Sequence, residues 1–200
     1  MFSSNATLAT PGAFSTNATT TVTGATAALT PGGALHVGRN GTGSLAVASG
    51  GLVTSTGDVF IGNGIGGTAS TGTASITGAG STLNVGATGT GTLNVGHFGT
   101  GTLTLGSGGT VNTGNLIFAG AAGYAGTLSR NTGGTLAVGG TNGLRNDGTA
   151  TFNLAGGTLK VAGTALTSFV PATLSNSSTV DTNGLSATLS GLLCCAPRCR

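Results

Sequence analysis

The stretch from Ser81 to Gly106 reads STLNVGATGTGTLNVGHFGTGTLTLG, and it decides the fold class of the chain. It contains three near-copies of one unit, Thr82–Gly86, Thr92–Gly96 and Thr102–Gly106. Each unit alternates polar and apolar residues, which is typical of a β-strand with one buried face. Each also ends in a glycine that favours a turn. One unit cannot bury its apolar face alone but stacked copies can, so the sequence predicts a β-solenoid.

A longer repeat supports the same prediction. Residues 35–62 read LHVGRNGTGSLAVASGGLVTSTGDVFIG, and residues 93–120 read LNVGHFGTGTLTLGSGGTVNTGNLIFAG. The two modules match phrase by phrase, with Ser49–Gly51 aligned to Ser107–Gly109 and a one-residue shift before the last strand. Strand pairs about 8–10 residues apart predict coils of two or three strands and roughly 20 residues.

The alternation assigns one set of apolar side chains to the interior of the solenoid. Threonine, asparagine and serine are assigned to the outside, where Asn84 and Asn94 are expected to occupy equivalent positions in a ladder of side-chain amides. The predicted inward residues are Leu35, Val37, Leu45, Val47, Val53, Val59, Ile61, Ile76, Leu83, Val85, Leu93, Val95, Leu103, Leu105, Val111, Leu116 and Phe118.

Composition and charge exclude several classes of protein. Glycine accounts for 41 of the 200 residues, but it does not recur at every third position, which excludes collagen. Only six basic and three acidic residues are present, and no Lys/Arg cluster suits a nucleic-acid partner. No apolar run approaches the roughly 18 residues of a membrane-spanning helix. Charge and sequence pattern therefore favour an ordered all-β repeat protein.

The chain divides into four segments. Residues 1–32 are expected to form an irregular or disordered N-terminal arm or edge coil, 33–124 regular solenoid repeats, and 125–193 less regular repeats. Residues 194–200 form an atypical tail with Cys194, Cys195 and Cys199, the only cysteines, so no disulfide framework supports the fold. The first residues do not resemble a signal peptide, and the abrupt tail is interpreted as a frameshift or truncation of a longer chain.

Several phrases resemble known bacterial repeats. "GTGTLTLGSGGTV" and "VFIGNG" in the two modules resemble the repeat associated with type V secretion and PEP-CTERM proteins. "FNLAGGTLKVAGTAL" and "STVDTNGLSATLSGLL" in residues 151–193 are similar to the strand repeat of autotransporter passenger domains. The resemblance implies a right-handed parallel β-helix on the surface of a Gram-negative cell, usually tethered by a C-terminal outer-membrane β-barrel. No barrel sequence is present in these residues.

No catalytic or metal-binding constellation is predicted. Asp58, Asp147 and Asp181 are widely spaced, whereas acid–base catalysis by carboxylates needs two in one site. The last two are interpreted as turn formers. His36 is expected to point outward between two inward residues, and His97 is expected in a turn. The two histidines lack a third ligand, so no metal is predicted.

Other motifs also predict structure and not chemistry. The phrase Gly62–Gly67 is not followed by Gly-Lys-Ser/Thr and is interpreted as a turn and not a phosphate loop. Calcium-binding Gly/Asp repeats would need an aspartate in each unit. The serines have no His and Asp partners at a triad spacing. We therefore predict no cofactor and no enzymatic activity.

The sequence thus predicts a non-enzymatic, surface-exposed or secreted passenger fragment of an autotransporter-like protein, with a structural or adhesive role. Its partners would be host, matrix or neighbouring-cell surface molecules. The alternative is a free-standing solenoid that binds a solid or polysaccharide surface through ice-binding-like threonine ladders; a carbohydrate-active β-helix enzyme is the least favoured reading. The supposed equivalent positions argue against a regular ladder, since they read Thr82/Asn84, Thr92/Asn94, Thr102/Thr104 and Ser44/Ala46.

Overall fold

The computed structural model describes residues 7–10, 14–66 and 68–195, and every regular element within them is a β-strand. The strands form three parallel sheets of eight strands each, stacked as a β-solenoid of about seven turns. The predicted parallel β-helix is therefore confirmed. Cys199, Gly67 and the first six residues of the expected N-terminal arm lie outside the described residues.

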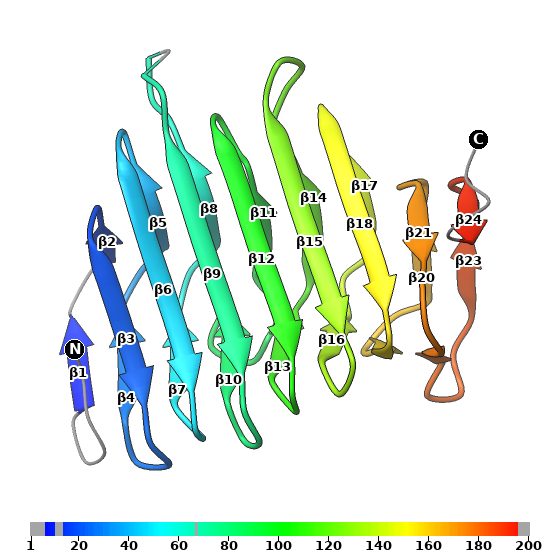
Figure 1. The fold of residues 1–200 in the computed structure, drawn as a ribbon, viewed down its shortest axis with the longest axis horizontal. Helices are drawn as coiled ribbons and strands as arrows, with labels where there is room; N and C mark the ends of the chain where they lie inside the picture. Colours follow the sequence, from blue (N-terminus) through cyan, green and yellow to red (C-terminus); the bar gives the residue numbers. More distant parts are fainter. Residues whose placement is uncertain (1–6, 11–13, 67, 196–200) are drawn as a thin grey trace.

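We name the three sheets A, B and C. Each turn of the solenoid contributes one strand to each sheet, in the order B, C, A (Figure 1). Sheet A contains β3 (Thr19–Thr23), β6 (Thr42–Ala48), β9 (Thr71–Thr77), β12 (Thr100–Gly106), β15 (Ala125–Asn131), β18 (Thr149–Ala155), β21 (Ala172–Leu174) and β24 (Leu193–Cys195). Sheet B contains β1 (Thr7–Thr10), β4 (Ala28–Pro31), β7 (Leu52–Ser55), β10 (Thr82–Val85), β13 (Thr110–Thr113), β16 (Thr135–Val138), β19 (Gly157–Val161) and β22 (Ser178–Asp181). Sheet C contains β2 (Phe14–Thr16), β5 (Leu35–Arg39), β8 (Val59–Asn63), β11 (Thr92–Val95), β14 (Asn115–Phe118), β17 (Leu144–Asn146), β20 (Leu166–Ser168) and β23 (Ala187–Leu189).

The coil is right-handed. Figure 1 shows the strands of sheet A running downward in front, while the strands of sheet C return upward behind as the chain advances from left to right. Parallel strands joined by crossovers strongly prefer this hand, because the right-handed twist of each strand directs the chain back onto its sheet in that sense.

The coils at both ends have about the predicted 20 residues, since Thr7 pairs with Ala28 and Phe152 with Ala172, but the central coils are longer. Asn84 hydrogen-bonds to Thr54, 30 residues earlier, and to Asn112, 28 residues later. Toward the C-terminal end the coils shorten, and Ser190 donates to the carbonyl of Ser168, 22 residues earlier. The repeat is therefore of variable length, and the length differences fall in the corners.

The predicted amide ladder between Asn84 and Asn94 is wrong. Asn84 lies in β10 of sheet B, whereas Asn94 lies in β11 of sheet C. The ten-residue spacing separates neighbouring sheets of one turn and does not mark equivalent positions in successive turns. A ladder does form, but it joins Asn84 to Asn112, whose Nδ2 donates to the Asn84 Oδ1 at 2.8 Å.

The core follows the predicted alternation. Every residue of the predicted inward set is buried, with at most 2% of its surface exposed. Equivalent residues stack from turn to turn, as Val53, Leu83 and Val111 do in sheet B. Full burial of such a side chain contributes about 1.5–3 kcal/mol, so this continuous apolar column supplies most of the stabilisation of the solenoid.

A column of glycines lets the corner between sheets C and A close. These glycines are in register across sheet A: Gly43, Gly72, Gly101 and Gly126. A Cβ added to Gly101 would lie 2.2 Å from the backbone nitrogen of Gly96 and 2.4 Å from the carbonyl oxygen of Ile61. Both neighbours are backbone atoms that cannot rotate away, and Gly96 itself has a φ of 80°. Glycine is thus required where two backbones meet.

Arg130 interrupts the apolar core. It points inward from β15, in register with Leu105 and Leu154 of the adjacent strands, and 0% of its surface is exposed. Its Nε, Nη1 and Nη2 atoms have no hydrogen-bond partner among the described residues. Burial lowers the pKa of the guanidinium to about 10. A buried cation without a partner costs several kcal/mol, so this coil is strained electrostatically.

We expect Gly101→Ala to lower the free energy of unfolding by roughly 2 kcal/mol or more, because the added methyl group overpacks the corner. Gly106→Ala in the same strand is the matched control, since its Cβ would meet only the side chain of Asn131, at 3.4 Å from the Asn131 Cβ. Urea unfolding of both variants gives the comparison. Equal losses would show that the close backbone approach at the corner does not limit side-chain size.

We expect Arg130→Leu to raise the free energy of unfolding by about 2–4 kcal/mol, because an apolar side chain replaces an unpartnered buried charge. Arg145→Leu serves as the control, since the Arg145 side chain is 48% exposed and should change stability by less than about 1 kcal/mol. Chemical denaturation at pH 7 measures both. No gain for Arg130→Leu would mean that its guanidinium is solvated in the folded chain.

Candidate functional site

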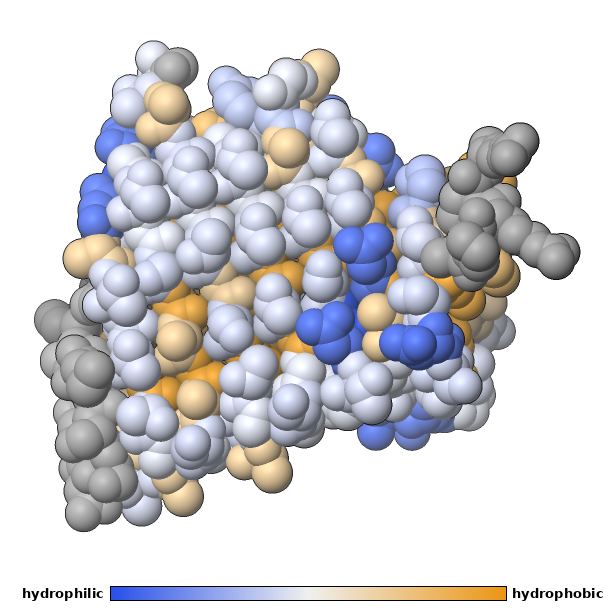
Figure 2. All heavy atoms as spheres, in the orientation of Figure 1, coloured by the Kyte–Doolittle hydropathy of each residue, from blue (hydrophilic) through white to orange (hydrophobic). Residues whose placement is uncertain are grey.

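The outer face of sheet A carries a regular array of hydroxyl side chains. Two columns of side chains cross the strands in register, and we call them together the threonine face. Figure 2 shows even rows of weakly polar side chains across the upper part of this side of the molecule, with apolar and strongly hydrophilic groups below them. The first column is Thr42, Thr71, Thr100, Ala125 and Thr149, and the second is Ser44, Thr73, Thr102, Thr127 and Thr151.

Strand geometry gives this array two fixed spacings. Neighbouring strands lie about 4.8 Å apart, and alternate residues along one strand lie about 6.7 Å apart. The χ1 angle of threonine is restricted by its branched Cβ, so the hydroxyl and methyl groups are held in few orientations. The threonine face is therefore a preorganised two-dimensional lattice of small polar and apolar groups.

The predicted irregularity of the threonine ladder holds only for the two pairs of sheet A, because Ser44/Ala46 lies in register with Thr102/Thr104. The pairs Thr82/Asn84, Thr92/Asn94 and Thr102/Thr104 lie in β10, β11 and β12, which belong to three different sheets of one turn. Pairs that are equivalent by strand register lie within sheet A. There the two columns of the threonine face are interrupted by Ala125 between β6 and β18, and the next column along the strands is interrupted by Ala46.

A second feature combines side chains of sheet C with those of the corners that follow it. We call His36, Phe60, His97, Phe98 and Tyr124 the aromatic cluster. The rings of His36 and Phe60, which pair across β5 and β8, stack with centroids 4.9 Å apart and planes 11° apart. His97 contacts Phe60 and Phe98 at 5.0 and 4.1 Å, and Phe98 contacts Tyr124 at 5.5 Å. One continuous strip of rings results.

The two histidines occupy positions consistent with the sequence pattern, but the structure brings them together. His36 alternates with the buried Leu35 and Val37 and so lies on the outer face, where the stacked ring of Phe60 leaves only 8% of it exposed. His97 lies in the turn between β11 and β12, as predicted. Their proximity was not predicted, because 61 positions of sequence separate residues that stacking makes neighbours.

Asn63 links the histidines. Its side chain is 6% exposed, its Nδ2 donates to His36 Nδ1 at 3.0 Å, and its Oδ1 accepts from His97 Nδ1 at 3.1 Å. In this orientation Nδ1 of His97 carries the proton, which leaves its Nε2 as an acceptor. The amide therefore fixes the orientation of both imidazoles and holds Nδ1 of His36 as an acceptor.

Burial lowers the pKa of both histidines. For His36 the main cause is desolvation, and the positive charge of Arg39 and the neighbouring His97 lower its pKa further. For His97 desolvation is the cause. Both imidazoles therefore favour the neutral form at pH 7, which suits their hydrogen bonds to a neutral amide.

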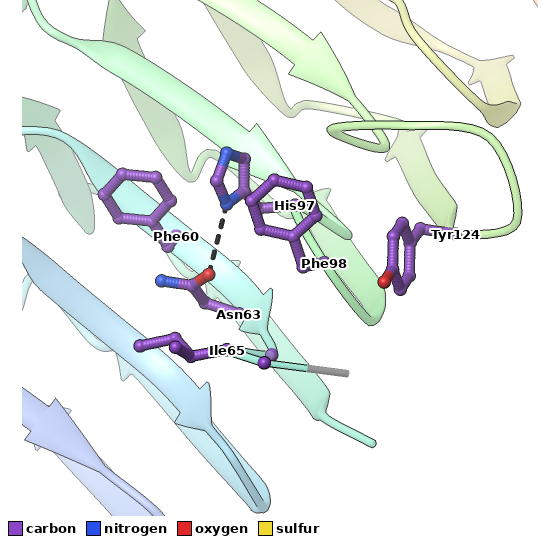
Figure 3. A pocket seen from close by; sticks show the side chains of 8 residues that line it. Phe60, Asn63, Ile65, His97, Phe98 and Tyr124 are labelled. Atoms are coloured by element: carbon purple, nitrogen blue, oxygen red, sulfur yellow. Dashed lines mark hydrogen bonds between the residues drawn. The ribbon is translucent and has the colours of Figure 1, made fainter. Parts of the chain in front are cut away.

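A cavity of about 370 Å³ opens beside this cluster (Figure 3). Phe60, Phe98, Tyr124 and Ile65 form its apolar walls, and Asn63 contributes a polar group. Phe98 and Ile65 are 38% and 46% exposed, so apolar surface borders the opening. The size lies at the lower end of the range of small-molecule sites, about 300–1,000 Å³.

The loop that closes one side of this cavity is held by backbone contacts. The amide of Ile65 donates to Asn40 Oδ1 at 2.6 Å, and the amide of Gly64 donates to the carbonyl of Phe98 at 2.9 Å. A Cβ on Gly64 would lie 2.2 Å from that carbonyl oxygen, so glycine is required. The phrase Gly62–Gly66 is thus the end of β8 and a turn, as predicted, and it forms part of the cavity wall.

The other candidate residues of the sequence stay apart. Asp58 accepts from the amide of Thr92, Asp147 pairs with Arg145 at 3.0 Å, and Asp181 accepts from the amide of Asn183. Among the described residues no group of three or more His, Cys, Asp or Glu side chains is arranged to hold a metal. Within the same residues, no helix has the length and apolar character needed to cross a membrane.

Comparison with known proteins gives no match: no family model, no curated protein and no solved structure is significantly similar to this chain. The two features described above are therefore interpreted from their own geometry.

We expect the free energy of unfolding to fall as the pH is lowered through 6.5. The pKa values of both histidines are lowered in the folded state, so the unfolded chain binds protons first. The stability loss begins near the unfolded value of 6.5 and continues down to the lowered folded values. Urea unfolding between pH 8 and pH 5 measures it.

The double variant His36→Gln/His97→Gln is the control for this pH dependence. It should be less stable than the parent at pH 7, because the stacking and the Asn63 hydrogen bonds change, but its stability should depend less on pH between 6.5 and 5. The same pH dependence in parent and variant would rule out the histidines as its source.

Proposed function

We propose that this chain is a non-enzymatic, surface-exposed or secreted β-solenoid with a structural and adhesive role, as in autotransporter-like passengers. The threonine face carries this proposal. It offers a repeated set of hydroxyl groups in register across sheet A. Single hydrogen bonds to such groups contribute only about 0.5–1.5 kcal/mol. Adhesion would therefore come from many simultaneous weak contacts on a rigid rod.

The composition of the chain supports an extracellular role. The resemblance to type V secretion and passenger repeats implies export. With 4% charged residues and a core built from local repeats, the chain would fold coil by coil as it emerges. Partners of this protein would be repetitive molecules on host, matrix or neighbouring-cell surfaces, and its location would be the exterior of a Gram-negative cell.

We expect antibodies raised against the purified chain to label intact cells of the source organism, and protease added to intact cells to remove that label. Permeabilised cells and a cytoplasmic marker protein provide the control. Labelling that needs permeabilisation would contradict the surface location, whatever the chain binds.

A second candidate function is binding to an ordered solid, such as ice or a crystalline polysaccharide. The observation that favours it is the register of the threonine face, where Thr100/Thr102 repeats Thr71/Thr73 in the next turn. An ordered solid presents periodic partners, and a rigid lattice of side chains loses little conformational entropy on contact. Binding to ice and binding to a crystalline polysaccharide both require a flat, repeated array of side chains, and neither requires a pocket.

We expect Thr100→Lys/Thr102→Lys to weaken adsorption of the chain to its solid at least tenfold, because two long charged side chains disrupt the flat array. Asn112→Lys on sheet B, the sheet that already carries Lys160, is the matched control and should adsorb like the parent. Adsorption to crystalline cellulose, and thermal hysteresis and partition into ice, are the measurements. Parent-like adsorption of the double variant would exclude the threonine face.

A further inference from the structure

The cavity beside the aromatic cluster has polar groups with unused hydrogen-bonding capacity. Asn63 makes two side-chain hydrogen bonds, which leaves one N–H and one oxygen lone pair. His97 uses Nδ1 and leaves Nε2 as an acceptor. The hydroxyl of Tyr124 makes no hydrogen bond to any described residue. Three neutral polar groups thus occur in a wall that is otherwise aromatic and aliphatic.

The shape of the site favours a ligand with one flat apolar face. The rings of Phe60, His97, Phe98 and Tyr124 contact one another in series, with successive planes inclined by 60–77°. Figure 3 shows Ile65 on one side of the space, Phe98 across from it and Tyr124 at its far end, with Asn63 hydrogen-bonded to His97. A ligand in this space would pack a face on the rings and direct its polar edge to the amide, imidazole and hydroxyl.

Charge excludes two other classes of ligand. No charged side chain lines the cavity, so an anion finds no cationic partner there. A quaternary ammonium ion would favour rings that surround it and a negative charge nearby. Here the rings lie in series, and the positive charge of Arg39 acts on His36 of the cluster. A neutral ligand fits the site best.

We infer that this cavity binds a pyranose ring of a neutral glycan. The C–H face of a pyranose with equatorial hydroxyls packs on an aromatic ring, and its hydroxyls both donate and accept, which matches the Asn63 amide, the His97 Nε2 and the Tyr124 hydroxyl. The cavity is lined by residues that do not belong to the threonine face. The inference therefore does not depend on the function proposed for sheet A.

The chain carries its own reporter for this site. Tyr124 is its single tyrosine, and tryptophan is absent from the sequence. Tyrosine fluorescence therefore reports on the surroundings of Tyr124, which are this cavity and a smaller neighbouring one that borders Thr71 and Thr100. We expect cellotetraose or maltotetraose, which are β-linked and α-linked neutral glucose chains, to change this fluorescence saturably with half-saturation at about 1 mM, as suits a shallow neutral site.

Paired phenylalanine variants test the location. Phe98→Ala removes a ring from the cavity wall and should weaken binding at least tenfold. Phe169→Ala removes a ring that is 68% exposed on a distant coil and should bind like the parent. Circular dichroism and thermal melting of each variant confirm folding. Calorimetry with Tyr124→Phe, which keeps the ring but lacks the hydroxyl, should show weaker but detectable binding.

Three results would overturn the inference. The first is the absence of a saturable change with either sugar up to about 20 mM in the folded parent. The second is equal weakening by Phe98→Ala and Phe169→Ala, which would place the effect outside the cavity. The third is a saturable response to tetramethylammonium chloride without one to the sugars, which would identify a cation site. Parent-like sugar binding by Thr100→Lys/Thr102→Lys would separate this site from the threonine face.

Discussion

The parallel hydrogen bonding between successive turns is the constraint on which the rest of the structure depends. Each strand pairs only with the same strand of the turn before and the turn after, so a residue in one turn faces its counterpart 20 to 34 positions away. Once the register is fixed, an inward leucine becomes part of an apolar column and an outward threonine becomes part of a hydroxyl column. Core and surface are thus ordered by one backbone interaction.

The sequence predicts this core well because burial has a period of two that does not depend on coil length. Apolar residues alternate with polar ones within each strand, whichever strand of the next turn pairs with it. Examples are Leu35, Leu45 and Val53, and all three are buried. Coil length and sheet number are harder to predict. The three Thr-Leu units resemble one another because strands of sheets B, C and A face the same interior, so similarity within a turn imitates repetition between turns.

The aromatic cluster could not be predicted from the repeat, because its residues depart from the repeat. His97, Phe98 and Tyr124 lie in corners after β11 and β14, where the coils differ in length and no alternation applies. Asn63 has a recognisable context at the end of β8, but its two histidine partners become neighbours only through stacking. A usable signal existed in composition: large rings are scarce in this chain, and Phe98 and Tyr124 fall in two successive corners that follow sheet C.

The two candidate surfaces follow from opposite uses of the repeat. The threonine face multiplies one weak contact by copying a Thr-Gly-Thr phrase at the same register, so its affinity would grow with the number of coils and tolerate the loss of one position such as Ala125. The cavity uses each of its groups once, so a single substitution should remove its binding capacity.

Arg130 shows that the core does not tolerate departures from the repeat as the threonine face does. The register that places threonine outside also places this guanidinium inside, where no neighbouring coil supplies a partner. A solenoid therefore permits variation at its corners and outer face, and its core is where a departure from the pattern is most costly.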